Sequence, residues 1–362
     1  IKLKDLWSSS HYNKSIRRGE PEYYFQKGIG WPTVNSSETT TFREFENSVC
    51  ATSTGAIYVP SDSNRLYCLG LLNCKFASQL LNLFNPTIHV LTSDVSNIPY
   101  IFCAKQEKAI ADCVQKCIAI SRQDWDSHET SWDFQGNELL TIDEQTYKEN
   151  INNFVEQHFE ETGERLDIDS SLPDTYSLAW RVEQYKQKWE HKFMQLHKNE
   201  EELNRQFIDI YGLQEELTPD VPLDEITILQ QGEISIEDCK IVWHDDVLMK
   251  QLISYAVGCM MGRYSIDHPG LILANQGDGA VEYEKLVPNS RFEVDDDGII
   301  PLMSSKTDFA DNATVRFKKW MSVVFGEDML VENLNFIEAA LGKSLDDYFV
   351  KDFWKYHKKM YL

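Results

Sequence analysis

One long helical pattern constrains the fold of this chain more than any other feature. Between residues 179 and 210, apolar side chains recur every three or four positions, which is the period of one face of a helix. The members of this stripe are Ala179, Val182, Tyr185, Trp189, Phe193, Leu196, Leu203, Phe207 and Ile210. A stripe of this length must be covered, so we predict a long helix packed against a partner in an antiparallel hairpin. Gly212 directly follows and predicts the C-terminal cap of this helix.

The rest of the chain mixes two kinds of pattern and predicts an α+β protein. Residues 22–25 and 55–59 are rich in aromatic or β-branched residues and are flanked by Gly, Pro or Ser, which is typical of strands. Residues 93–99 are predicted to form a turn. A helical period predicts one helix over 64–84, ending at Asn85-Pro86. Further helices are predicted at residues 105–122, 151–159, 245–261, 308–325, 328–341 and 345–360.

Charge is distributed unevenly along the 362 residues, whose net charge is −23. Residues 1–125 contain 13 Lys and Arg against 11 Asp and Glu, whereas residues 126–362 contain 22 against 47. Only the first third is therefore suited to approach phosphates, and nucleic acid would repel the remainder. The acidic part is better suited to contact basic protein surfaces.

Several functional classes find no support in the sequence. No run of eighteen apolar residues and no signal peptide occurs, so we expect a cytoplasmic protein without a membrane segment. The eight cysteines form no CxxC pair and are expected to be reduced. There is no phosphate-binding loop, zinc-protease helix, serine elbow or glycine-rich S-adenosylmethionine loop. An unrecognised active site would need a cleft with perturbed acids, and no spacing of residues in this sequence suggests one. We therefore expect no catalytic residue, metal site or cofactor in this chain.

Binding chemistry is concentrated between residues 11 and 43, where basic and aromatic side chains alternate. Cations neutralise phosphates, Arg reads guanine edges, and aromatic rings stack on bases. Acidic residues lie among these cations, and an aromatic residue at strand spacing is equally compatible with a core position. The candidate DNA-binding residues are Lys14, Arg17, Arg18, Tyr23, Tyr24, Lys27, Trp31 and Arg43.

Four strings stand out in the first third: PEYYFQKGIGW (residues 21–31), STGAIYV (53–59), LGLLNCK (69–75) and DVSNIP (94–99). Together they resemble the specificity region of TaqI-like adenine methyltransferases. Later strings resemble the PglX-type adenine-specific DNA methyltransferases of BREX phage-defence systems. These are DWDSHETSWDF (124–134), GCMMGRYS (258–265), ENLNFI (332–337) and KDF (351–353). Residues 204–217 resemble the helical end of recognition regions in large restriction-modification enzymes.

The resemblance implies a division of the chain into three segments. Residues 1–125 would be a mixed α/β target-recognition domain that contacts double-stranded DNA. Residues 126–217 would be a helical hairpin spacer, and residues 218–362 an acidic, mainly α-helical C-terminal domain.

The resemblance also implies what the intact protein does. It would transfer a methyl group from S-adenosylmethionine to adenine N6, and other defence-system proteins are possible partners. The chain opens on Ile1, and the Asn85-Pro86-Thr87-Ile88 string lacks the second proline and the aromatic residue of the base-binding motif. We therefore expect upstream residues to be missing and this part to be inactive alone. The alternative is an acidic scaffold that docks other defence-system subunits, which a helix with exposed apolar residues beyond its own packing would favour.

Overall fold

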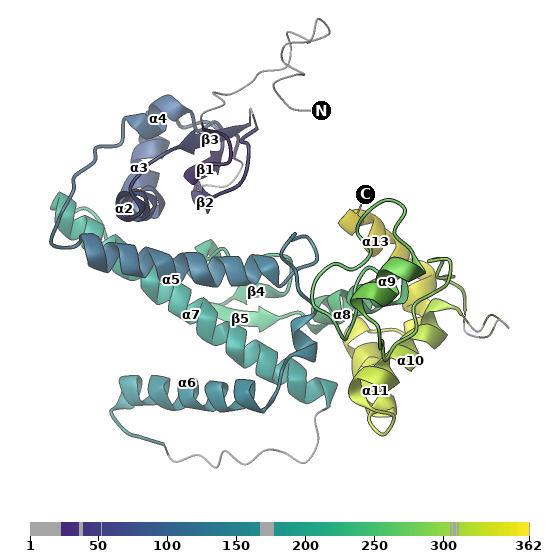
Figure 1. Ribbon diagram of the computed structural model, residues 1–362. Coiled ribbons are helices and arrows are strands. Elements are labelled where there is room, and N and C mark those ends of the chain that lie inside the picture. Colours follow the sequence, from purple (N-terminus) through teal and green to yellow (C-terminus); the bar gives the residue numbers. More distant parts are fainter. Residues whose placement is uncertain are drawn as a thin grey trace, which may run out of the picture. The chain divides into compact units, whose positions relative to one another are not determined.

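The computed structural model describes residues 23–35, 39–51, 53–166, 177–304, 306, 309 and 311–361 (Figure 1). The chain is an α+β protein, as predicted, with far more helix than strand. It divides into two compact units. Unit 1 contains Ile1–Ala119 and Leu196–Pro222, and unit 2 contains Ile120–Gln195 and Leu223–Leu362. Among the described helices, none is long and apolar enough to cross a membrane.

Unit 1 contains a three-stranded antiparallel sheet in the order β2-β1-β3. The strands are β1 (Gly28–Pro32), β2 (Arg43–Phe45) and β3 (Thr54–Ile57). Residues on a strand alternate between its faces, so Ile29 and Trp31 of β1 enter the core, whereas Gly28 and Gly30 lie on the other face. The predicted strand at 22–25 is wrong, since residues 23–25 form a turn. Phe25 has a φ of 63°, a left-handed conformation that a strand does not accommodate.

The helices of unit 1 differ from the prediction at one place. A single helix was predicted over 64–84, but α2 (Asp62–Asn73) and α3 (Lys75–Phe84) are separated by the extended residue Cys74. The backbone N–H of Lys75 at the start of α3 donates to Asn204 Oδ1 at 2.8 Å. This side chain comes from a segment 129 residues further along, so a tertiary contact replaces the missing helical bond. As predicted, α3 ends before Asn85-Pro86, and the predicted turn contains the short helix α4 (Thr92–Ser96).

The core of unit 1 includes side chains from two distant parts of the sequence. The first turns of α5 (Glu107–Asp126) contribute Ile110 and Val114. The second half of α7 (Leu178–Tyr211) contributes Leu203 and Phe207, and the Phe207 ring meets Tyr67 edge-on at 5.4 Å. The predicted long helix is therefore confirmed, and Gly212 follows it with a φ of 68°. Because its second half packs in unit 1, the observed units are discontinuous in sequence, unlike the three contiguous segments expected from the sequence.

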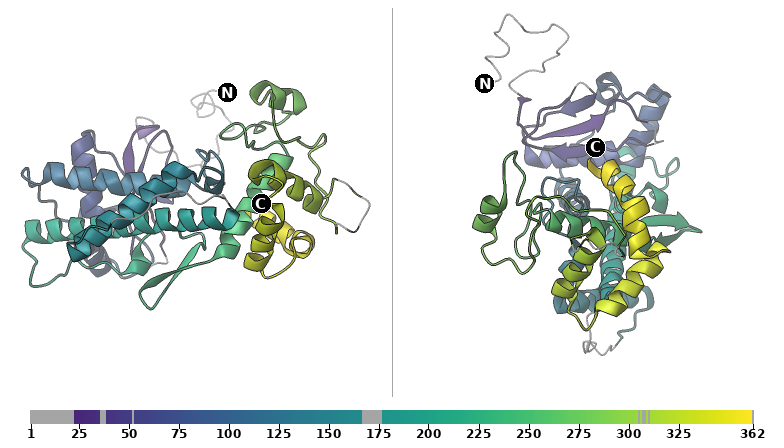
Figure 2. Two further views of the ribbon diagram at one scale, coloured as in Figure 1. Left: turned by 90° about the horizontal axis from the view of Figure 1, so that it is seen from below. Right: turned by 90° about the vertical axis from the view of Figure 1, so that its right-hand side faces the viewer.

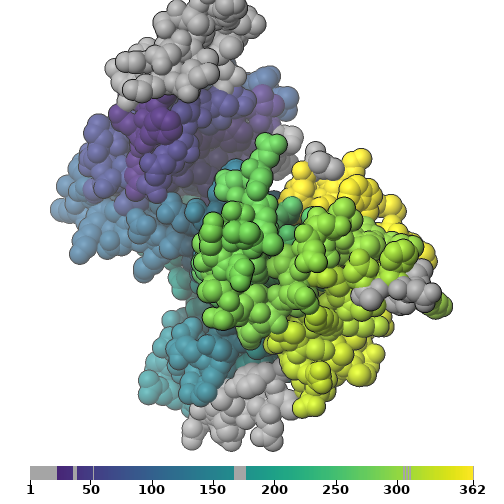
Figure 3. All heavy atoms as spheres, turned by 45° about the vertical axis from the view of Figure 1, so that its right-hand side comes forward, coloured from purple at the N-terminus to yellow at the C-terminus, as the bar shows by residue number. Residues whose placement is uncertain are grey.

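Unit 2 is mainly helical and is built around α8 (Asp245–Met260), which packs against α10 and α11 (Figure 2). Residues Leu252, Ile253 and Ala256 of α8 are fully buried. The C-terminal residues, green to yellow in Figure 3, form a closely packed surface. The other helices are η2 (Glu138–Leu140), α6 (Glu144–Thr162), η3 (Leu223–Glu225), α9 (Ala280–Leu286), α10 (Ala313–Phe325), α11 (Leu330–Leu341), α12 (Leu345–Tyr348), η4 (Phe349–Phe353) and α13 (Trp354–Tyr361).

A β-hairpin in unit 2 was not predicted. It pairs β4 (Ile234–Glu237) with β5 (Lys240–Trp243) through the two-residue turn Asp238-Cys239. Both turn residues have positive φ, at 48° and 58°. Such a turn normally contains Gly or Asn, and their absence removed the sequence signal.

Candidate nucleic-acid interface and a buried polar network

The described candidate DNA-binding residues all belong to unit 1, in or near β1 and β2. Tyr23 is 40% exposed, Tyr24 is half-buried, and Lys27 and Arg43 are exposed. Trp31 is buried. The remaining candidates lie outside the described residues; they are Lys14, Arg17 and Arg18.

Trp31 is a core residue, which was the second interpretation of its position in the sequence. It is only 2% exposed, and its indole N–H donates to the Val90 carbonyl at 3.1 Å. Its ring lies 5.4 Å from that of Phe42 and covers Gly55 on β3. A side chain in this position cannot contact DNA unless the core opens, so Trp31 supports the sheet from inside.

The opposite face of the sheet carries a layer of aromatic rings. The Phe45 ring occupies the space above β1, where a Cβ added to Gly28 would lie 2.7 Å from its Cζ. Tyr58 meets Phe45 edge-on at 5.8 Å, and Tyr23 stacks on Tyr58 at 4.7 Å and 21°. Burial, with a smaller contribution from the Cys50 thiol, raises the pKa of Tyr58 to about 12, so this hydroxyl is neutral at ordinary pH. The layer is an uncharged platform beneath the turn at residues 23–25.

Two cations close to the sheet, Lys27 and Arg65, are compensated to different degrees by neighbouring carboxylates. Lys27 Nζ lies 3.8 Å from Glu44 and 3.7 Å from Glu46, both beyond direct hydrogen-bond distance. Arg65 is buried and pairs more closely, at 2.9 Å from Glu44 and 2.5 Å from Asp62. Lys27 therefore keeps donor capacity for a phosphate, whereas the guanidinium of Arg65 is already held by two carboxylates.

A polar hollow in unit 1 was not anticipated from the sequence. Its amide and hydroxyl groups are suited to hydrogen bonds with base edges or phosphates. The only advance signal was a concentration of Asn and Thr in the loops around residues 35–40 and 82–89. The hollow is lined by Asn35, Thr40, Leu81, Asn82, Asn85, Thr87, His89, Val90 and Asp94.

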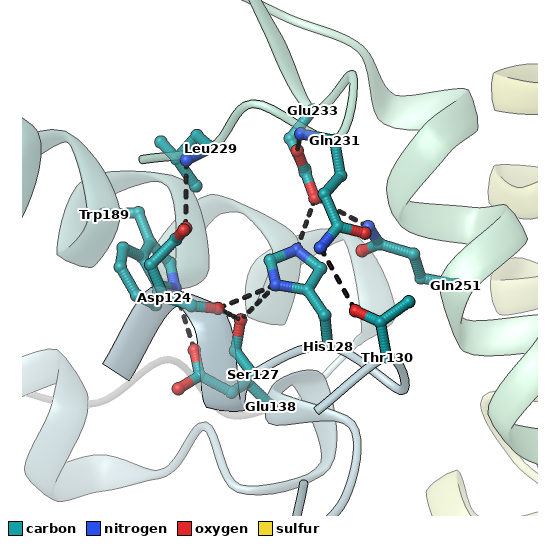
Figure 4. A network of polar contacts seen from close by, with 10 residues as sticks. All are labelled: Asp124, Ser127, His128, Thr130, Glu138, Trp189, Leu229, Gln231, Glu233 and Gln251. Carbon is teal, nitrogen blue, oxygen red and sulfur yellow. Dashed lines mark hydrogen bonds and ion pairs between the residues drawn. The ribbon is translucent and has the colours of Figure 1, made fainter. Parts of the chain in front are cut away.

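Unit 2 contains a buried polar network around His128 (Figure 4). The Nδ1 atom of His128 lies 2.7 Å from the Asp124 carbonyl oxygen, and Nε2 lies 2.6 Å from Glu233 Oε1. Glu233 also accepts hydrogen bonds from the Gln251 side chain at 2.7 Å and the Gln231 backbone at 2.9 Å. The contacts join the segment after α5 to the segment before β4.

The chemistry of this network is that of a structural ion pair. Burial opposes the charged form of His128, but the Glu233 carboxylate outweighs it and raises the His128 pKa. Hydrogen bonds from His128 and Gln251 likewise hold the Glu233 pKa below its usual value although burial favours the neutral acid. Both imidazole nitrogens face oxygen acceptors, so neither can take a proton from Ser127, whose hydroxyl donates to the Asp124 carbonyl at 2.7 Å. The network therefore provides no general base.

Two carboxyl groups near this network have strongly shifted pKa values. Burial raises the pKa of Asp124 to about 6 and that of Glu129 to about 7. Asp124 accepts the Leu229 backbone N–H at 2.9 Å, and Glu129 accepts the Tyr361 hydroxyl.

A small hollow lies near the network, but its lining does not include these two acids or His128. It is lined by Ser127, Asn137, Glu138, Leu139, Tyr185, Leu248 and Gln251. Both perturbed acids are instead hydrogen-bonded within the fold. Among the described residues, no group of three His, Cys, Asp or Glu side chains is placed to hold a metal ion.

Comparison with known proteins relates the chain to one kind of enzyme. No family model matches it. It is 32% identical over 358 residues to the adenine-specific methyltransferase PglX of Lacticaseibacillus casei (strain Zhang), covering 93% of this chain and 25% of that protein. It is 30% identical over 369 residues to the adenine-specific methyltransferase BrxX of Escherichia coli O9:H4 (strain HS), covering 96% and 27%. Nearly the whole chain is thus similar to adenine-specific methyltransferases named PglX and BrxX. It spans only about a quarter of the length of these two proteins.

Proposed function

We propose that unit 1 recognises duplex DNA for an adenine-specific methyltransferase of the BREX type, whose catalytic part lies elsewhere in the intact protein. One observation carries the proposal: the outer face of the sheet in unit 1 has a supported layer of aromatic rings, and the exposed cations Lys27 and Arg43 lie next to β1 and on β2. The names of the similar proteins supply the chemical context. Cations would position the DNA backbone, and amides of the polar hollow would contact base edges.

S-adenosylmethionine would serve the intact protein, but the described residues do not fit it. The hollow of unit 1 is lined mainly by polar side chains, and its two apolar residues, Leu81 and Val90, do not make an apolar slot for an adenine ring. Its one carboxylate, Asp94, already accepts hydrogen bonds from the Asn85 amide and the Leu91 backbone. We therefore derive no methyl-transfer step from residues of this chain.

A salt series of duplex-DNA binding tests the proposal. Binding by the 362-residue chain should weaken as salt rises, because each phosphate contact releases counterions. Lys27→Ala and Arg43→Ala should each weaken binding and reduce the slope of log K against log salt by about 1. The matched control is Lys148→Ala, which removes an exposed lysine from α6 in unit 2. If the wild-type chain binds no duplex even at low salt, the proposed function is lost.

A second candidate function is favoured by α6. Asn150 is the only buried residue of this 19-residue helix, while Phe154 and Phe159 are 57% and 49% exposed. The helix also carries five glutamates against the single lysine Lys148. An acidic helix with an uncovered apolar face fits a basic, apolar groove on another protein. This candidate makes the chain a scaffold that docks another subunit of the defence system.

Binding to purified companion proteins of the same defence system tests the scaffold. The double variant Phe154→Ser/Phe159→Ser should lose binding while its affinity for DNA is retained. Asn153→Ala, on the other side of α6 from both rings, is the control and should bind like the wild type. Equal binding by all three proteins would exclude α6 as the docking surface.

A further inference from the structure

Phe25 combines an exposed ring with a backbone conformation that aromatic residues rarely adopt. The residue is 64% exposed, and its φ is 63°. A Cβ is unfavourable in the left-handed region, so a position selected for stability alone would contain Gly or Asn. Exposure of an apolar ring to water is unfavourable as well. Two unfavourable features at one residue indicate that Phe25 has a binding role and not a structural one.

The turn that carries Phe25 is held from several sides. The Phe25 N–H donates to the Ser48 carbonyl at 3.1 Å, and the Gln26 N–H donates to the Tyr23 carbonyl at 3.4 Å. Asn47, which precedes Ser48, is also left-handed, with a φ of 53°. Two unusual turns are therefore joined by a backbone hydrogen bond, which fixes the direction in which the Phe25 side chain leaves the chain.

Aromatic contacts support the same turn. The Tyr24 ring meets Phe25 edge-on at 6.5 Å. Tyr23 stacks on Tyr58, which in turn rests against Phe45 over the glycines of β1. The turn that carries the exposed ring is thus anchored to a packed layer through Tyr23, so its backbone is ordered before a ligand binds.

The surroundings of Phe25 indicate the kind of ligand. Lys27 follows two residues later, is exposed, and lies too far from Glu44 and Glu46 for direct hydrogen bonds. An apolar planar ring with a cation two residues away matches a nucleobase and its neighbouring phosphate. A purely apolar protein groove would use the ring but leave the cation without a role.

We propose that Phe25 stacks on a nucleobase at one step of bound duplex DNA and partly unstacks that step, while Lys27 contacts the adjacent phosphate. This inference rests on the proposed function and deepens it. Through Phe25, affinity would depend on how easily the bound DNA deforms, because base-pair steps that unstack easily would be preferred.

Fluorescence of 2-aminopurine provides the test. A duplex is first selected from a random pool by the wild-type chain, and its adenines are then replaced one at a time by 2-aminopurine, which brightens when it loses its stacking neighbours. The wild type should brighten one or two adjacent positions. Phe25→Ala should abolish this signal and weaken binding by roughly 5- to 100-fold, as expected for loss of one base–aromatic stack. The salt slope should not change, because no phosphate contact is removed.

Three further variants separate stacking from folding. Phe25→Trp should retain both the fluorescence signal and the affinity. Phe25→Gly relieves the backbone strain and should therefore unfold no more easily than the wild type, yet it should lose the signal as Phe25→Ala does. Val49→Ala removes another exposed apolar side chain of unit 1, 47% exposed, and should leave both readouts unchanged.

The outcomes distinguish this inference from the function on which it rests. If the wild type enriches no duplex and binds none, DNA recognition itself fails. If the wild type binds but Phe25→Ala and Phe25→Gly keep the fluorescence signal, stacking by Phe25 is overturned while DNA recognition stands. If these two variants bind DNA more weakly but still brighten 2-aminopurine, stacking by Phe25 is likewise overturned.

Discussion

His128 and Glu233 lie 105 positions apart in the sequence and are joined by a 2.6 Å contact inside unit 2. Their side chains are only 4% and 0% exposed. A buried ion pair contributes little net stability compared with apolar packing, but removal of one partner leaves a buried charge without compensation. At the scale of single residues, this pair is therefore the most sensitive contact of the network in Figure 4.

We predict that His128→Ala lowers the free energy of unfolding by about 3–5 kcal/mol, because Glu233 remains buried without its cationic partner. Urea unfolding followed by circular dichroism measures the change. The control is Lys148→Ala, which breaks a half-exposed pair with Glu144 on α6 and should cost less than about 1 kcal/mol. Equal effects of the two substitutions would contradict the structural role of His128.

The pair also responds to pH in two opposite ways. The pKa of His128 is raised, so its contribution is complete below the unfolded pKa and is lost as pH rises through the folded one. The pKa of Glu233 is lowered, so its contribution is present above the unfolded pKa and is lost as pH falls through the folded one. The pair is therefore most stabilising at pH values between these limits.

Glu129 imposes a separate pH dependence. Its pKa is about 7 in the folded protein, above that of an exposed glutamate, so the folded state binds the proton more tightly. Stability should then fall as pH rises from about 4 to about 8. We predict that Glu129→Gln flattens this part of the profile and is more stable than the wild type at pH 8, by on the order of 2 kcal/mol. The free energy of unfolding is measured with urea at pH 5 and pH 8. If the wild type and Glu129→Gln lose the same stability over this range, the assignment is refuted.

At the scale of elements, the pairing of β1 with β3 depends on close contact between one ring and one glycine. Trp31 lies opposite Gly55 in the strand register. A Cβ added to Gly55 would lie 2.3 Å from the indole ring. The ring is also held by its hydrogen bond to the Val90 carbonyl, so it has little freedom to move away.

We predict that Gly55→Ala destabilises the protein by about 1–3 kcal/mol, the usual cost of overpacking in a core. Thermal unfolding measures the loss. Thr54→Ala on the same strand is the control and should cost less than about 1 kcal/mol, because it only removes atoms from a side chain that is not buried. If Gly55→Ala were as stable as the wild type, the ring would not be fixed as described.

At the scale of the whole molecule, unit 1 is assembled from two separate stretches of chain. Leu203 and Phe207 of the second stretch belong to its core. The second stretch also changes the charge, since residues 196–222 contain two basic and seven acidic residues. Unit 1 as folded thus contains 14 Lys and Arg against 17 Asp and Glu, and unit 2 contains 21 against 41. Under the proposed function, attraction to DNA would therefore come from a local face of unit 1, since its total charge is slightly negative.

We predict that residues 1–125 alone do not unfold cooperatively, because Phe207 and Leu203 are missing from the core. Addition of residues 196–222 through a flexible linker should restore a cooperative transition in near-ultraviolet circular dichroism. The same fusion with Phe207→Ala is the matched control and should lose about 3–5 kcal/mol of stability. Cooperative unfolding of residues 1–125 without the second stretch would show that the core is complete without α7.

The sequence by itself determined the elements whose causes are local. The apolar period predicted α7, Gly212 predicted its end, and Asn85-Pro86 predicted the end of α3, because helix periodicity and capping depend on residues a few positions apart. It also predicted the α+β class and identified Lys27 and Arg43, which are exposed. Whether these two residues contact DNA stays a prediction.

Only the tertiary structure decided the features that depend on distant residues. Asn204 accepts the hydrogen bond of the Lys75 N–H where α3 begins. Trp31 belongs to the core and not to the surface. Glu233 contacts His128, 105 positions away in the sequence. Phe25 was not singled out, because its left-handed turn is held by Ser48 on a neighbouring segment. The physical reason is common to all four: a hydrogen bond or a packed ring joins separate segments of the chain, and local patterns such as periodicity and turn residues do not reveal which segments meet.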